Sequence, residues 1–142
     1  VGKGGNLLLN VGPRGDGSLE PTEASHLAAV AGWMERHASA IHDVEPGLEP
    51  WQWYGPSTRR GDRVFLMCVQ RPYDAVTVRG VPIKRIERIV DLASGTELAF
   101  TTRCAVLDEL LNSDPHGEAR ILVPADLVDD LATVFSMDIR PL

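Results

Sequence analysis

The chain has 142 residues, of which 44% are hydrophobic and 24% are charged, and its formal net charge is −6. This length corresponds to one domain, and the apolar fraction is sufficient for a packed core. The negative charge argues against nucleic acid as a partner, because no positive field attracts the phosphates. The longest strongly apolar run, at 64–69, is far shorter than the roughly 18 residues that a membrane-spanning helix needs.

The first 42 residues predict one strand followed by one helix. Three consecutive leucines, Leu7 to Leu9, indicate a strand that is apolar on both faces, as in a parallel sheet covered by helices. Gly12-Pro13 ends this strand, and the glycine-rich stretch at 14–17 predicts a loop. A helix is expected from about Pro21 to Ser39, because proline suits the first helical turn and apolar residues recur at three- and four-residue spacing.

Residues 43–62 predict an inter-domain linker, because proline and glycine interrupt them repeatedly and no apolar period survives. This segment carries an aromatic cluster, Trp51, Trp53 and Tyr54. Two interpretations stay open: the rings stack on sugar rings as a substrate-binding platform, or they pack the following domain against the preceding helix. Because successive side chains of an extended segment point in opposite directions, at least one ring is expected to face inward.

Residues 63–142 predict an antiparallel β-sandwich, because short strands alternate with turn sequences. The expected strands are 63–69, 75–78, 85–92, 97–101, 103–111, 118–123 and 133–140, with 93–96 as a hairpin turn. The last strand alternates in hydrophobicity. It is expected to turn Phe135, Met137 and Ile139 toward the core and Ser136, Asp138 and Arg140 outward.

The cysteines and histidines do not suggest a metal site. The two cysteines are Cys68 and Cys104, the four histidines are scattered, and neither type forms a ligand spacing. Cys68 lies within an apolar strand, where a small buried side chain is typical. A disulfide between the two stays open for an exported protein. No cofactor motif is present, and no compartment is indicated.

Two segments resemble one known family. The run Lys3-Gly-Gly-Asn-Leu-Leu-Leu-Asn-Val-Gly-Pro13, followed by Asp16-Gly17, looks like the last barrel strand of the family 29 α-L-fucosidases. The run Trp53-Tyr-Gly-Pro-Ser-Thr-Arg-Arg-Gly-Asp62 resembles the segment before the first long strand of their C-terminal sandwich. After the helix, the family often has Ala-Ile-Tyr-Gly where this chain has Ala40-Ile-His-Asp43. The resemblance implies a (β/α)8 barrel followed by a β-sandwich.

A complete barrel of this type needs about 250 residues, more than this chain contains. Since it also begins at Val1, we expect an excised C-terminal segment of a retaining exo-α-L-fucosidase, an enzyme that removes terminal α-L-fucose from glycoconjugates. The expected divisions are a strand–helix unit left over from the barrel at 1–42, the linker at 43–62 and the sandwich at 63–142. The fold class is therefore mainly β.

The resemblance also implies that the chain contains no catalytic residue, because the family's reactive carboxylates come from earlier barrel strands. Asp16, Glu20 and Glu23 are the acidic residues nearest the expected end of the barrel strand, and turn or helix N-terminal roles account for them. The chain by itself is expected to be an inactive accessory or structural domain.

The expected partners are the parent catalytic barrel and, through it, fucosylated glycans. An alternative function is a carbohydrate-binding module that uses Trp51, Trp53 and Tyr54, and a third is a protein-interaction sandwich unrelated to sugars. Without the rest of a barrel, the strand at Leu7–Leu9 has unpaired edges. It then adds to the sandwich, pairs with another copy or frays, and we expect self-association.

Overall fold

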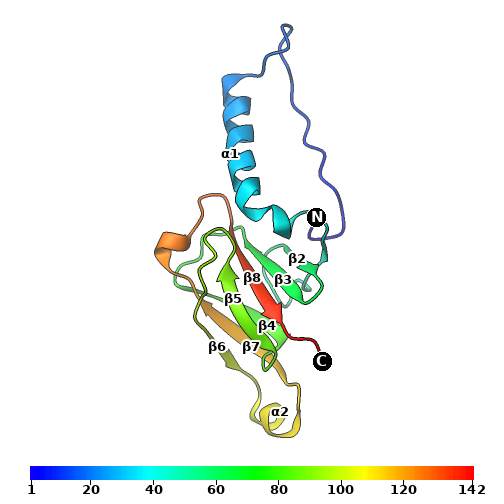
Figure 1. Cartoon of the computed structure of the whole chain (residues 1–142), viewed down its shortest axis with the longest axis vertical. Coiled ribbons are helices and arrows are strands. Elements are labelled where there is room, and N and C mark those ends of the chain that lie inside the picture. The colour runs from blue at the N-terminus through cyan, green and yellow to red at the C-terminus, as the bar shows by residue number, and fades with distance from the viewer.

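Two antiparallel sheets and one long helix make up the computed structural model, which describes all residues from 1 to 142. The first sheet has the order β1-β2-β3-β8-β5, and the second has the order β4-β7-β6. In Figure 1, the N-terminal segment and helix α1 lie at one end of an elongated molecule and α2 lies at the other. The predicted class, a mainly β sandwich preceded by a helix, is confirmed.

The elements follow one another along the chain with these bounds. The strands are β1 (Glu45–Pro46), β2 (Ser57–Arg60), β3 (Arg63–Cys68), β4 (Ala75–Pro82), β5 (Ile86–Asp91), β6 (Phe100–Arg103), β7 (His116–Leu122) and β8 (Thr133–Ile139). The helices are α1 (Pro21–His37) and α2 (Val106–Leu111), with short 3₁₀ turns η1 (Ala38–Ala40) and η2 (Ala125–Leu127). No helix is both long enough and apolar enough to cross a membrane.

The main core lies between the two sheets and contains 15 buried residues. Strand β8 contributes Phe135, Met137 and Ile139, as its alternation predicts. Leu66 of β3 pairs with Phe135, and Ile121 of β7 approaches from the opposite sheet. The apolar alternation of the last strand therefore identified the face that meets the core.

The other face of the first sheet is also covered, which the sequence did not predict. Phe65 and Val134 form a second buried cluster with Ala40 of η1, and Trp33 of α1 packs against it. Ser136, expected to face outward, is only 5% exposed, so that expectation is wrong. The reason is that the C-terminal end of α1 and η1 lie over this face. Arg140 is exposed, as expected.

The N-terminal segment contains the expected helix but not the expected strand. Helix α1 begins at Pro21 and continues into η1, close to the predicted limits. The leucines at 7–9 form no strand, and their exposed fractions are 81%, 94% and 58%. A strand of a parallel sheet exists only through hydrogen bonds to its neighbours, and the chain provides none at this position.

Residues 43–62, expected to form a linker, contribute β1 and β2 to the first sheet. Strand β2 pairs with β3 along its whole length, from Ser57 opposite Leu66 to Arg60 opposite Arg63. The region between the helix and the sandwich is therefore part of the first sheet. Its backbone hydrogen bonds to neighbouring strands stabilise it despite its many proline and glycine residues. The expected domain limits stay a prediction.

The turn after β5 is as predicted, but a helix between β6 and β7 was not predicted. The Asp91 amide donates to the Thr96 carbonyl oxygen at 2.8 Å, so the turn at 93–96 is confirmed. The chain then enters the second sheet as β6. The strand expected at 103–111 is wrong beyond Arg103, since α2 follows, in a sequence rich in leucine, which favours a helix.

Cys68 and Cys104 are both free, so the disulfide is absent.

A fully buried histidine lies where α1 meets the sandwich. The His37 Nδ1 atom is 2.9 Å from the Trp33 carbonyl oxygen, and the centroids of the two rings are 4.6 Å apart, with their planes tilted by 31°. The Nε2 atom has no hydrogen-bond partner. Burial therefore lowers the pKa of His37, and this outweighs the opposing effects of the Trp33 carbonyl, Asp129 and Asp91.

The pKa of His37 predicts that acid loosens this junction. A histidine with a lowered folded-state pKa takes up its proton first in the unfolded chain, so stability is complete above the ordinary value of 6.5 and falls as pH drops below it. Urea unfolding at about pH 7.5 and about pH 5 measures the change, and the midpoint is expected to be lower at the acidic pH. A His37→Gln variant with the same pH dependence as the native chain would contradict this explanation.

Candidate functional site

Of the acidic residues that follow the leucine segment, Asp16 and Glu20 are engaged in local contacts, whereas the Glu23 Oε2 atom is buried without a hydrogen-bond partner. The Asp16 carboxylate accepts hydrogen bonds from the Ser18 amide at 3.0 Å and its hydroxyl at 2.7 Å, which lower the pKa of Asp16. Glu20 forms an ion pair with Arg14 at 2.6 Å, and Glu23 lies in the first turn of α1. These are the turn and helix-start positions that the sequence predicts for them.

The aromatic cluster is divided between the interior and the surface. Trp53 is 2% exposed and belongs to the main core, where its Nε1 atom donates to the Met67 carbonyl oxygen at 3.3 Å. Trp51 and Tyr54 are 65% and 52% exposed. The expectation that at least one ring faces inward is confirmed. Because Trp53 has no free face, only Trp51 and Tyr54 remain available to a ligand.

The Trp51 ring packs against a β-bulge in β4. The pairing of β4 with β7 shifts between Val78 and Val81, and Gly80 at this bulge has φ +60°. Gln52 donates through Nε2 to the Gly80 carbonyl oxygen at 3.0 Å, and the Arg79 amide donates to the Gln52 carbonyl oxygen at 2.9 Å. These bonds fix the loop, and the edge of the Trp51 ring rests on the Gly80 backbone.

The Tyr54 hydroxyl group is occupied by a hydrogen bond within the protein. The hydroxyl forms a hydrogen bond with the Cys68 sulfur, and the ring lies against Trp53 with centroids 4.4 Å apart and an interplanar angle of 40°. Burial, with the Cys68 contact, raises the pKa of Tyr54, and burial also raises the pKa of the Cys68 thiol. Tyr54 therefore offers a ligand an exposed ring rather than a free hydroxyl.

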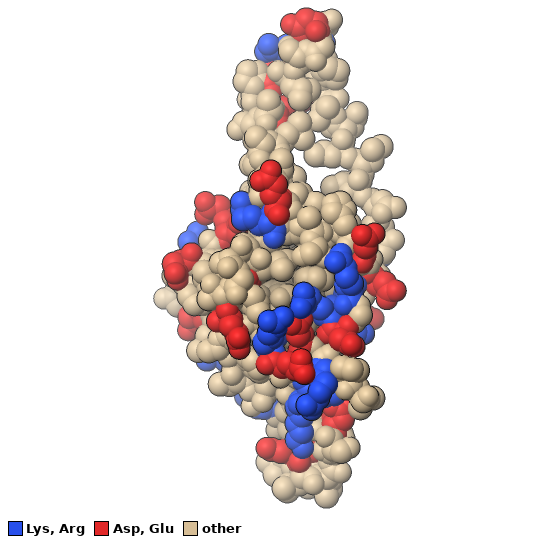
Figure 2. Space-filling model, in the orientation of Figure 1, with Lys and Arg blue, Asp and Glu red and all other residues tan.

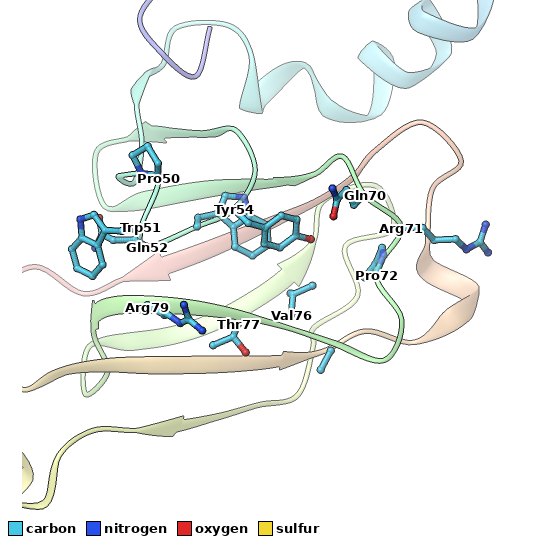
Figure 3. A pocket seen from close by; sticks show the side chains of 12 residues that line it. Pro50, Trp51, Gln52, Tyr54, Gln70, Arg71, Pro72, Val76, Thr77 and Arg79 are labelled. Carbon is cyan, nitrogen blue, oxygen red and sulfur yellow. The ribbon is translucent and has the colours of Figure 1, made fainter.

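A cavity of about 410 Å³ lies between the 50–54 loop, the turn at 70–72 and β4. Figure 3 shows Trp51 and Tyr54 on one side, with Thr77 and Arg79 on the opposite side. The charged residues that line it are Arg71 and Arg79, and no Asp or Glu does so. No sequence pattern indicated Arg79, although a glycine next to an expected strand, here Gly80, is a known signal of a bulge.

Gly80→Ala is expected to be more destabilising than Gly61→Ala. Both glycines have positive φ, so each substitution incurs a backbone penalty of roughly 1–2 kcal/mol. A Cβ atom on Gly80 would also lie 2.3 Å from the Trp51 ring, whereas nothing lies within 4 Å at Gly61. This overlap adds about 1–3 kcal/mol. Urea unfolding measures both variants, and the excess is expected to disappear when Trp51→Ala is added. Equal losses for the two alanine variants would contradict the contact.

Residues 1–39 match the family model described as alpha-L-fucosidase. The chain is 33% identical over 89 residues to the human tissue alpha-L-fucosidase, a match that covers 58% of this chain and 18% of the human protein. It is 31% identical over 88 residues to the Branchiostoma floridae alpha-L-fucosidase, covering 58% of this chain and 19% of that one.

Solved structures extend the likeness to almost the whole fold. The alpha-L-fucosidase isoenzyme 1 from Paenibacillus thiaminolyticus superposes with a TM-score of 0.76 at 23% identity, over 96% of this chain and 31% of that one. The Thermotoga maritima alpha-fucosidase gives a TM-score of 0.72 at 23% identity, over 97% and 31%. The chain thus spans under a fifth of these curated relatives and about a third of these solved structures. In sequence and in fold, the chain is similar to part of the α-L-fucosidases.

Proposed function

We propose that the chain is the C-terminal part of a retaining exo-α-L-fucosidase, which hydrolyses terminal α-L-fucose from glycoconjugates. The observation that carries the proposal is the joint match: residues 1–39 fit the family model, and the fold of 96% of the chain superposes on a fucosidase. In this proposal the chain is an accessory and structural domain. The parent supplies the barrel that binds the fucosylated glycan.

The positions of the acidic side chains support a catalytic centre outside this chain. A retaining glycosidase needs two carboxyl groups about 5–5.5 Å apart, one as nucleophile and one as acid/base. The acid must also have a raised pKa, which burial near apolar groups provides. Among the acidic residues after the leucine segment, Asp16 has a lowered pKa and Glu20 is neutralised by Arg14. Neither environment suits an acid catalyst.

Activity assays of the chain and of its longer parent test this proposal. The 142-residue chain should release no nitrophenol from a nitrophenyl α-L-fucoside above the buffer rate, whereas the parent with a complete barrel should hydrolyse it with retention. Turnover by the chain alone that vanishes on replacing one Asp or Glu would contradict the accessory role. A parent without α-L-fucosidase activity would overturn the proposed function itself.

We also propose that the parent barrel covers the N-terminal segment. Leu7, Leu8 and Leu9 are exposed, and Val30 on α1 is 44% exposed. Figure 2 shows charged side chains gathered over the sandwich and few of them on the N-terminal segment and α1. An apolar surface of this kind, joined to unpaired backbone groups, favours pairing with further strands and burial beneath helices.

In the isolated chain, the same surface is expected to cause self-association. Light scattering should give a mass above that of one chain at high concentration, because exposed apolar side chains find a partner. A Leu8→Asp variant should be monomeric, since a charge in the contact must be desolvated. Tyr73→Asp is the matched control, because Tyr73 is 93% exposed on the sandwich. A native chain that is monomeric at every concentration would contradict this prediction.

A further inference from the structure

We propose that the cavity between the 50–54 loop and β4 binds a saccharide that carries an anionic group, either a carboxylate or a sulfate. Its volume of about 410 Å³ is in the usual range of ligand pockets, about 300–1,000 Å³. The proposal is independent of the fucosidase assignment, because it concerns a site on the sandwich and is tested with saccharides that contain no fucose.

The first argument is that Trp51 is exposed and yet fixed. The neighbouring Gln52 holds the loop by two hydrogen bonds, and the Trp51 ring itself lies against Gly80. An exposed tryptophan with no ligand to bind would gain little from such a position. The rigid position means that a ligand loses little free energy in ordering the ring. One face of a sugar ring consists of C–H groups, which pack well on an indole surface.

The second argument is the charge of the lining. The chain has 20 acidic residues and a net charge of −6, but the cavity is lined by two arginines and no carboxylate. This local excess of positive charge favours an anionic ligand over a neutral one. Arginine also binds carboxylate and sulfate-like oxygens through two parallel N–H groups, which gives geometric selectivity.

The third argument is that the two guanidinium groups are only weakly engaged. The Arg79 Nε atom is 3.4 Å from a Glu118 oxygen, whereas Arg103 approaches the other Glu118 oxygen to 2.6 Å. Glu118 is therefore held mainly by Arg103. Arg71 is 3.8 Å from Asp130, and both of these side chains are largely exposed. Exposed pairs of this length contribute little, so either arginine can turn to a ligand.

The hydroxyl and amide groups needed for a sugar are also present. Thr77 on β4 and Gln70 in the turn before β4 line the cavity together with Arg79 and Tyr54. Figure 3 shows these polar groups distributed around the aromatic rings. Each of these groups complements part of an acidic sugar. The exposed rings match its C–H faces, the polar groups match its hydroxyls, and the arginine matches its anionic group.

Titration of the 142-residue chain by tryptophan fluorescence and calorimetry tests the proposal. One probe is a hyaluronan tetrasaccharide, which carries carboxylates without sulfate, and another is a carrageenan tetrasaccharide, which carries sulfates without carboxylate. Fully N-acetylated chitotetraose is the neutral probe. At least one anionic probe should bind about tenfold or more tightly than the neutral one, and added salt should weaken the binding. Whichever probe binds identifies the anionic group.

Substitutions distinguish binding in this cavity from nonspecific electrostatic attraction of an anionic saccharide. Trp51→Ala and Arg79→Gln should each weaken binding about tenfold, while Trp51→Tyr keeps a ring and should retain part of it. Tyr73→Ala and Arg59→Gln are the controls, because Tyr73 and Arg59 are exposed and do not line the cavity. Thermal unfolding of every variant identifies any that has lost its fold. Three results would each overturn the proposal: no binding of either anionic probe, equal binding of chitotetraose, or unchanged binding by a folded Trp51→Ala.

Discussion

The central position of β8 is the constraint on which the rest of the structure depends. This last strand of the chain lies between β3 and β5 in the first sheet, so it must form hydrogen bonds along both edges. Both of its faces are also covered, by the second sheet on one side and by η1 and the end of α1 on the other. Only Asp138 among its residues is ionisable, and Arg63 and Arg88 neutralise it and lower its pKa. The two-sided burial of β8 therefore couples the helix to the sandwich through His37, Trp33 and Val134.

The opposite orientations of two tryptophans in the 50–54 loop create the candidate site. The Trp53 side chain enters the core and the Trp51 side chain stays exposed, so the position of the loop over β4 is fixed. The bulge at Gly80 provides this support, since the absence of a Cβ atom allows the Trp51 ring to rest on the backbone. Asp43 has a φ of +52°, and aspartate is among the few residues other than glycine that tolerate this region.

The sequence predicted those elements that depend on local signals. Helix α1 carries its own proline start and apolar stripe, and the 93–96 turn and the core face of β8 follow from local pattern. The failures involve distant partners. Leu7–Leu9 has the composition of a strand but no neighbour. By contrast, β2 pairs with β3 and β1 pairs with β2, although the segment around them is rich in proline. Ser136 was placed outside because the cover over its face comes from a helix about 100 residues earlier. In the site, Trp51, Trp53 and Tyr54 were found by composition, but Arg79 was not, since only the fold brings β4 beside the aromatic loop.

Our central proposal is that this sandwich folds around β8 and that residues 7–9 pair with barrel strands of a longer parent protein. Amide hydrogen exchange, compared between the dilute monomeric chain and the longer parent protein, tests it most directly. The β3 and β8 amides should be protected in both proteins, whereas Leu7, Leu8 and Leu9 should exchange rapidly in the isolated chain and slowly in the parent. Equal protection of the three leucine amides in both proteins would contradict the account.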